Sequence, residues 1–197
     1  MDRRDTCSLT FDDGPDPVWT PRVLDCLRGE GARATFFVMA ERASARPGLI
    51  DRMHAEGHEV ELHCARHIRH SELDEPALRR DTDRGLRTLA GLGAHVRRWR
   101  PPWGVVTEAT RAVAEERELE IVCWSADTED WCGDPAEVMH ERVAARLRAG
   151  SVVLMHDGLG PGATRTGCHE TVELIPRLTA TLRARGLRAV PLSENAG

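Results

Sequence analysis

Residues able to do chemistry occur in this sequence as short clusters at the ends of apolar runs. Asp12 and Asp13 follow one apolar run, and His156 ends another. His63 and His67 have the HxxxH spacing that aims two imidazoles at one point. Two neutral imidazoles and one carboxylate, with coordination positions left open for water, form a catalytic rather than a structural zinc site. We therefore predict a metal site made of the two histidines and one carboxylate of the aspartate pair, with the other carboxylate facing the bound water.

Each cluster also has a simpler structural explanation. The segment Asp12-Asp13-Gly14-Pro15 consists of turn residues, so on its own it indicates a tight turn. His70 lies three residues after His67 and could compete with it as a ligand. We favour the pair of His63 and His67 because His63 directly ends a predicted strand.

The elements that must position these clusters alternate regularly along the chain. The predicted strands cover residues 7–11, 34–38, 59–63, 97–100, 121–125, 151–156 and 187–191, and the predicted helices cover residues 20–28, 47–56, 75–89, 107–117, 134–149 and 170–185. Such alternation requires parallel strands joined by helical crossovers, so the predicted class is α/β. Alternation alone is compatible with a doubly wound sheet or a barrel. No linker or repeat interrupts it, so we expect one domain spanning residues 1–197.

Most of the polar clusters follow the carboxyl ends of predicted strands, which places them on the same rim of the fold. The members are Asp12, Asp13, His63, His67, Arg100, Asp127, Asp130, His156 and Asp157. Carboxyl ends of parallel strands share one rim, which carries the active site in barrels and the ligand crevice in open sheets. We therefore expect one shared site at this rim.

Composition excludes several functions. The chain has 197 residues, with 32 acidic and 27 basic side chains and a net charge of −5, which disfavours binding to nucleic acid by phosphate neutralisation. No apolar run approaches the length of a membrane span. All basic residues are Arg, and Lys and Tyr are absent, so a Lys nucleophile, a Tyr acid and a phosphate-binding P-loop are excluded.

The first residues and the cysteines indicate in which cellular compartment we expect the protein. The first six residues, Met1-Asp2-Arg3-Arg4-Asp5-Thr6, are followed by no long apolar stretch, so we expect no signal peptide and a cytoplasmic protein. The six cysteines include no CxxC pair, which argues against a zinc ribbon or a thioredoxin-like motif. We expect free thiols in a reducing compartment.

Five segments in this order resemble the polysaccharide deacetylase family, carbohydrate esterase family 4, also called the NodB-homology domain. They are Thr10-Phe11-Asp12-Asp13-Gly14-Pro15, His63-Cys64-Ala65-Arg66-His67, Arg100-Pro101-Pro102-Trp103-Gly104, Asp127-Thr128-Glu129-Asp130-Trp131 and Leu154-Met155-His156-Asp157. With the alternation around them, the resemblance takes in the whole chain. It implies a distorted (β/α)7 barrel, consistent with the seven predicted strands.

The resemblance also implies roles at the metal. Asp13, His63 and His67 would bind one divalent ion, with Zn²⁺ expected first and Co²⁺ or Ni²⁺ as alternatives. Asp12 would be the general base on the water that the metal holds. Arg100 would pair with Asp12 and keep it ionised.

Further roles implied by the resemblance concern the leaving group and the substrate. His156 would be the general acid, and Asp130 would orient it and raise its basicity. Trp131 would form a wall of the substrate groove, and Leu154 would line the pocket for the acetyl methyl group. The backbone N–H of Trp103 would help to bind the oxyanion.

Three positions depart from the family pattern. Cys64 replaces the usual hydroxyl residue between the two histidines, Trp103 stands where Tyr is common, and Glu61 stands where Asn is common. All catalytic positions of the pattern are nevertheless filled, which argues against an inactive relative.

The resemblance implies a metal-dependent hydrolase that removes an N-acetyl group from an amino sugar or a small acetamide. The alternative is a cytoplasmic amidohydrolase that opens a cyclic imide or ureide, or cleaves another small amide; the absence of a signal peptide and the compact chain favour it. A catalytically silent carbohydrate-binding module is a third reading, against which the intact motifs argue. We predict no nucleic-acid or membrane partner, and the sequence implies no particular oligomeric state.

Overall fold

The computed structural model of the chain describes residues 5–195. Residues 1–4 and 196–197 of the expected 1–197 domain therefore lie outside the described residues. The expectation of no signal peptide concerns residues 1–4 and so falls in this part of the chain. The strands are β1 (Thr6–Asp12), β2 (Thr35–Met39), β3 (Glu59–Cys64), β4 (Arg98–Trp99), β5 (Glu120–Ile121), β6 (Ala126–Asp127), β7 (Val152–His156) and β8 (Arg188–Ala189). The helices are α1 (Trp19–Gly29), α2 (Ala40–Ser44), α3 (Pro47–Ala55), α4 (Glu75–Gly91), α5 (Glu108–Glu116), α6 (Ala136–Ala144) and α7 (His169–Ala184).

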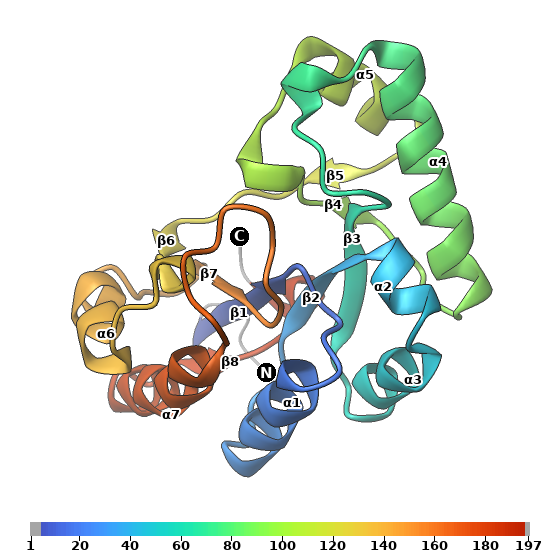
Figure 1. Cartoon of the computed structure of the whole chain (residues 1–197). Coiled ribbons are helices and arrows are strands. Elements are labelled where there is room, and N and C mark those ends of the chain that lie inside the picture. The colour runs from blue at the N-terminus through green and yellow to red at the C-terminus, as the bar shows by residue number, and fades with distance from the viewer. Residues whose placement is uncertain (1–4, 196–197) are drawn as a thin grey trace.

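The strands form one curled parallel sheet. Its order is β5-β4-β3-β2-β1-β7-β6, and β8 pairs with the start of β1. Every pairing between described strands is parallel, and no pairing joins β5 to β6, so the barrel stays open there. Figure 1 shows the helices around the outside of this sheet. The α/β class and the distorted (β/α)7 barrel are therefore confirmed.

The expected strand at 121–125 is wrong, and the opening of the barrel explains why. The strand β5 ends at Ile121 after pairing with β4, and β6 begins only at Ala126, where it pairs with β7. Between them the carbonyls of Val122 and Cys123 accept hydrogen bonds from the Arg100 side chain, both at 3.3 Å. A continuous apolar run thus bridges two separate edges of the sheet, which hydrophobic pattern alone does not reveal.

Helix boundaries were predicted less well than helix positions. The helix expected over 134–149 begins after Pro135 and ends at Ala144. The first helix begins at Trp19 and not with Thr20 as its cap, because the Asp16 carboxylate accepts the backbone N–H groups of Val18 and Trp19. The five-residue helix α2 was not predicted. The Thr107 cap of α5 is present, with its hydroxyl accepting the N–H of Thr110.

The two faces of the sheet differ in polarity. In β1, Cys7, Leu9 and Phe11 belong to the apolar core under the helices, whereas Thr10 and Asp12 point to the other face. Alternation along a strand sends successive side chains to opposite faces. The polar face therefore lines the inside of the half-barrel, and its last residue at the rim is an aspartate.

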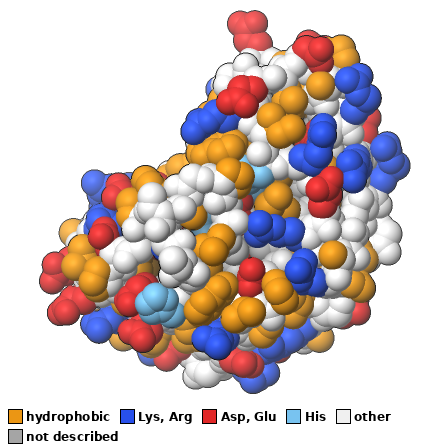
Figure 2. All heavy atoms as spheres, in the orientation of Figure 1, with side chains coloured by type: hydrophobic (Ala, Val, Ile, Leu, Met, Phe, Trp, Pro, Cys, Tyr) orange, Lys and Arg blue, Asp and Glu red, His pale blue; other side chains and the backbone are white. Residues whose placement is uncertain are grey.

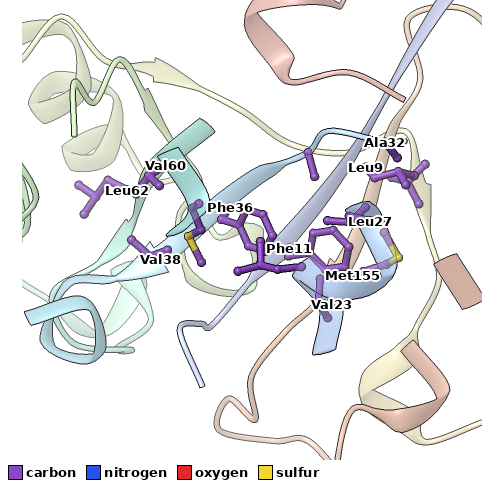
Figure 3. Packing of buried hydrophobic residues seen from close by; sticks show 14 of the residues in the cluster. Leu9, Phe11, Val23, Leu27, Ala32, Phe36, Val38, Val60, Leu62 and Met155 are labelled. Atoms are coloured by element: carbon purple, nitrogen blue, oxygen red, sulfur yellow. The ribbon is translucent and has the colours of Figure 1, made fainter. Parts of the chain in front are cut away.

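The outer core centres on two stacked rings. Phe11 of β1 and Phe36 of β2 have ring centroids 5.1 Å apart with an angle of 19° between their planes, and Figure 3 shows Val23 and Leu27 of α1 packed beside them. These side chains are fully buried and fasten the first helix to the two strands that carry the centre of the sheet. None of the helices within residues 5–195 is long and apolar enough to cross a membrane.

Replacing Phe36 tests how much this contact stabilises the sheet. Phe36→Ala removes a fully buried ring and leaves a cavity, so we expect a loss of about 3–5 kcal/mol in the free energy of unfolding. The matched control is Val18→Ala, because Val18 is 49% exposed and surface changes cost within about 0.5 kcal/mol. Urea unfolding of both variants measures the difference. Equal midpoints would contradict the assignment of Phe36 to the core.

Candidate active site

The clusters expected at the rim do converge there. Parallel pairing places Asp12 at the end of β1 beside His156 at the end of β7. His63 lies near the end of β3, next to β2 in the sheet, and Arg100 follows β4. Figure 2 shows the molecular outline notched between the part built from α4, α5 and β5 and the part that carries α6 and α7. The open edge of the sheet therefore opens the site to one side.

Three side chains could hold a metal ion. Asp13 Oδ1 lies 3.4 Å from His63 Nε2 and 3.2 Å from His67 Nε2, and one ligand atom from each residue lies within 4.8 Å of the others. Burial alone would raise the pKa of Asp13, but the neighbouring imidazoles of His63 and His67, together with charge from His63 and His156, lower it well below its usual range. The carboxylate is therefore charged, as a metal ligand must be.

The surroundings of these three side chains fit a divalent cation. His63 Nδ1 lies 2.7 Å from the carbonyl oxygen of Arg100, so it carries the proton and leaves Nε2 free to ligate. Asp13 Oδ1 is buried and has no hydrogen-bond partner in the described part of the chain. A buried anionic oxygen without a donor is costly unless an ion satisfies it. Two imidazole nitrogens and one carboxylate oxygen are typical ligands of catalytic zinc.

His70, the competing candidate, points elsewhere. Its Nδ1 lies 2.9 Å from Thr110 Oγ1, and its ring packs against Trp99 with centroids 4.9 Å apart. Burial lowers the pKa of His70 to about 4, so it is neutral and joins the rim loop to α5. The structure thus brings together the pair of histidines that the sequence favoured.

Asp12 lies beside the metal cluster and is held by a buried arginine. Arg100 Nη1 donates to Asp12 Oδ1 at 2.8 Å and to Thr10 Oγ1 at 2.7 Å. Arg100 is 0% exposed, and its guanidinium lies 4.1 Å from the centre of the Phe37 ring. No described residue hydrogen-bonds Asp12 Oδ2, and Asp12 lines the cavity at the rim. One carboxylate oxygen is thus anchored and the other is available to accept a proton.

His156 lies beside Asp12 at the end of β7 and is bound to Asp130. The distance from His156 Nδ1 to Asp130 Oδ1 is 2.6 Å, and the His156 backbone N–H donates to Asp130 Oδ2 at 2.9 Å. Burial would lower the pKa of His156, but the charge and hydrogen bond of Asp130 reverse this and raise it to about 9. Burial would likewise raise the pKa of Asp130, yet the charge of His156 holds it at about 2. At neutral pH the pair is an imidazolium facing a carboxylate.

An open cavity of about 370 Å³ connects the two halves of the site. Trp103 and Trp131, which are 37% and 41% exposed, stand in its wall together with Leu154. All three were predicted as substrate-binding residues. Arg100 and Asp130 do not line the cavity; they lie buried behind Asp12 and His156.

Sequence reasoning missed part of the wall. Trp124 and Arg69 line the cavity, and the Arg69 guanidinium lies 4.2 Å from the Trp103 ring centre. The loop at 158–163 forms a further side and includes three glycines. The four glycines between 158 and 167, directly after a predicted strand end, were a usable signal for a loop at the rim. No sequence pattern pointed to Trp124 or Arg69, because neither residue belongs to a motif.

Two departures from the family pattern have structural explanations. Burial raises the pKa of the Cys64 thiol well above its usual value, so it stays protonated and is not a thiolate ligand. Glu61 Oε2 accepts the backbone N–H groups of Arg97 and Arg98, and its other oxygen pairs with the Arg98 side chain. Glu61 therefore joins β3 to β4 and does not face the metal cluster.

Comparison with known proteins agrees with the geometry. The family model described as polysaccharide deacetylase matches residues 2–122. A peptidoglycan-N-acetylglucosamine deacetylase of Bacillus cereus is 34% identical over 95% of this chain and 86% of the relative. A chitooligosaccharide deacetylase of Bradyrhizobium sp. is 38% identical over 94% of this chain and 88% of the relative.

Solved structures give the same result. A family 4 carbohydrate esterase from Streptomyces lividans, solved with acetate, superposes with a TM-score of 0.85 at 31% identity, covering 94% of this chain and 91% of that one. A peptidoglycan N-acetylglucosamine deacetylase, solved with a benzamide ligand, gives a TM-score of 0.90 at 32% identity, with 98% and 88% covered. The prediction of an enzyme of the deacetylase class is confirmed at the level of the family: this chain belongs to the polysaccharide deacetylase family, carbohydrate esterase family 4.

Proposed function

We propose that this protein is a metal-dependent deacetylase that hydrolyses the N-acetyl group of an amino sugar. One observation carries the proposal. The cluster of Asp13, His63 and His67 lines one open cavity together with an anchored carboxylate, Asp12, and a protonated imidazole, His156. Hydrolysis of an amide needs a base for the attacking water and an acid for the leaving nitrogen, and both groups stand at the cavity that the cluster lines.

The residues present would hold Zn²⁺, and Co²⁺ or Ni²⁺ suit the same donors. When bound, such an ion supplies Lewis-acid polarisation of the acetyl carbonyl and makes water more acidic. Asp12 takes the proton of the attacking water through its free oxygen, Oδ2. Arg100 keeps Asp12 in place by holding Oδ1.

His156 completes the reaction by donating a proton to the leaving nitrogen. With Nδ1 bound to Asp130, Nε2 is the nitrogen left to face the substrate. Trp103 adopts a left-handed backbone conformation, with φ at 55°, in the loop after Arg100. We assign the backbone N–H of Trp103 to the developing oxyanion, an electrostatic contribution that matters most in a cavity with little water.

The cavity and the relatives together favour a sugar substrate. Exposed tryptophan rings in an open wall offer flat apolar surfaces to the face of a sugar, and Leu154 lies where an acetyl methyl group can pack. The relatives named above act on N-acetylglucosamine units or chitooligosaccharides, as their names state. These names favour deacetylation over the opening of a cyclic imide, and the filled catalytic positions disfavour a silent binding module.

Acetate release tests the reaction. Protein loaded with Zn²⁺ is expected to release acetate from N-acetylglucosamine oligomers, and Asp12→Asn or His156→Ala is expected to lower kcat/KM by about 10²- to 10⁴-fold. His169→Ala is the matched control, because His169 is exposed, contacts Glu170 and the Trp19 ring, and does not line the cavity. No acetate from any acetylated sugar would refute the proposal, and turnover of a cyclic imide without acetate would establish the alternative.

Metal binding can be measured without turnover. Equilibrium dialysis followed by elemental analysis is expected to find about one divalent ion per chain. Removing a residue that only hydrogen-bonds a metal ligand typically weakens metal binding by roughly 10- to 100-fold. His67→Ala removes a ligand itself, so it should weaken binding by more than this. His70→Asn should bind the ion as the parent does, because His70 bonds to Thr110 and not to the cluster. Equal affinities for the parent and the His67 variant would overturn the ligand assignment.

The pH profile tests the proton donor. His156 donates only when protonated, and its pKa is about 9, so activity should fall as the pH rises through that region. Asp130→Asn removes the charge that raises this pKa, so the alkaline limb of the kcat profile should move to lower pH. Asp134→Asn, on the same loop but paired with Arg142, should leave the limb in place. An alkaline limb that does not move in the Asp130 variant would show that His156 is not the group observed.

A further inference from the structure

One buried arginine outside the five motifs binds the proton-donor pair. Arg165 lies in the loop between β7 and α7, and its side chain is 4% exposed. Its Nη1 lies within hydrogen-bond distance of three acceptors, Asp130 Oδ2 at 2.9 Å, Asp130 O at 3.0 Å and Thr171 Oγ1 at 2.6 Å, and its Nη2 donates to His156 O at 3.1 Å and Gly158 O at 3.3 Å. One side chain thus joins the turn at 130–132, the end of β7 and the start of α7.

These contacts fix the orientation of the Asp130 carboxylate. Asp130 Oδ2 accepts from Arg165, from the Thr171 hydroxyl at 2.7 Å and from the His156 backbone N–H at 2.9 Å. The other oxygen, Oδ1, is left with the His156 ring. Because each oxygen has its own partners, the carboxylate cannot rotate without breaking several charge-assisted hydrogen bonds. The imidazole that bonds to Oδ1 is thereby aimed as well.

The same arginine holds the glycine loop at the cavity wall. Arg165 donates to the Gly158 carbonyl, and from the other side Arg42 donates to the carbonyls of Leu159 at 2.9 Å and Asp13 at 2.8 Å. A Cβ added at Gly160 would overlap the Asp13 carboxylate, so the loop lies directly against the metal cluster. The loop is therefore fastened to the metal side by Arg42 and to the proton-donor side by Arg165.

We propose that Arg165 is a positioning residue for the reaction: it orients the Asp130–His156 pair and holds the loop at 158–163 against the site. This inference rests on the proposed function only for the role of His156, since the contacts themselves belong to the folded protein. Arginine suits the task because Nη1 and Nη2 of its planar fork present four N–H groups to these acceptors in a fixed geometry, while Nε has no partner among the described residues. A lysine at this position could reach at most three of the five acceptors.

Kinetics of Arg165 variants test the proposal in the full chain loaded with Zn²⁺. In Arg165→Ala, kcat for acetate release should fall on the order of 10²-fold, the cost of a misplacement of about 1 Å. KM should rise as well, because the loop wall is released. Arg165→Lys should recover only part of kcat. The matched control is Arg142→Ala, which removes an arginine bonded to the Thr128 carbonyl and Asp134 on the same segment without touching Asp130. It should retain the parent kinetics.

Two measurements separate positioning from a general loss of structure. The 2.6 Å His156–Asp130 hydrogen bond should give a low-field proton resonance that is absent in His156→Ala. Arg165→Ala should shift or lose this resonance, and millimolar guanidinium, which fits the vacated space, should restore both the resonance and kcat. Methylammonium, which lacks the planar fork, should restore neither.

Opposite results would overturn the proposal. An Arg165→Ala variant with parent kcat and an intact resonance, or one whose loss follows its melting temperature and does not respond to guanidinium, would reduce Arg165 to a structural residue. If the parent itself released no acetate, the resonance and its recovery by guanidinium would still decide the positioning role. Failure of the proposed function and failure of this inference are therefore distinguishable.

Discussion

The whole rim depends on one buried ion pair. The Arg100 guanidinium is fully buried, and it reaches Asp12 and Thr10 on β1 as well as two carbonyls of the chain between β5 and β6. It therefore spans the sheet near the edge where the barrel fails to close. Removing one partner of a buried pair leaves an uncompensated charge, which typically costs about 3–5 kcal/mol. The pair constrains the open half-barrel and the base of the site at the same time.

The open edge gives the site its shape. A closed barrel of this size would fill its interior with side chains, and a substrate could reach the metal cluster only from the rim. Because β5 and β6 do not pair, Trp124 and Trp131 stand on the chain beside that gap, in the wall of the cavity.

The sequence predicted the class of fold, and it predicted that the two histidines lie together with one carboxylate of the aspartate pair, because both follow from local order; the choice of Asp13 came from the family resemblance. Strand ends are marked by where an apolar run stops, and parallel pairing brings those ends to one rim. The split of the run at 121–125 could not be predicted, because it depends on contacts distant in sequence: β5 pairs with β4, β6 pairs with β7, and Arg100 binds the carbonyls between them. The contacts of Arg42 and Arg165 with the loop at 158–163 could not be predicted for a similar reason. An arginine on a helix or in a loop is normally exposed to solvent, so the sequence gives no sign that it is buried. Only tertiary structure shows that each binds buried carbonyls.

The two carboxylates of the site differ in what holds them, and this difference separates their roles. Asp12 is paired with an arginine, whose charge is fixed across the accessible pH range, so its partner neither gives nor takes a proton. Asp130 is paired with a histidine, whose proton can leave, and is held on its other side by Arg165. When the environments of two acid–base groups push their pKa values apart, one group can accept a proton and the other can donate one at the same pH. A hydrolysis needs both of these proton transfers. A chain that has arginine as its only basic residue besides histidine suits this division, because a guanidinium can fix a carboxylate through several donors while histidine alone moves the proton.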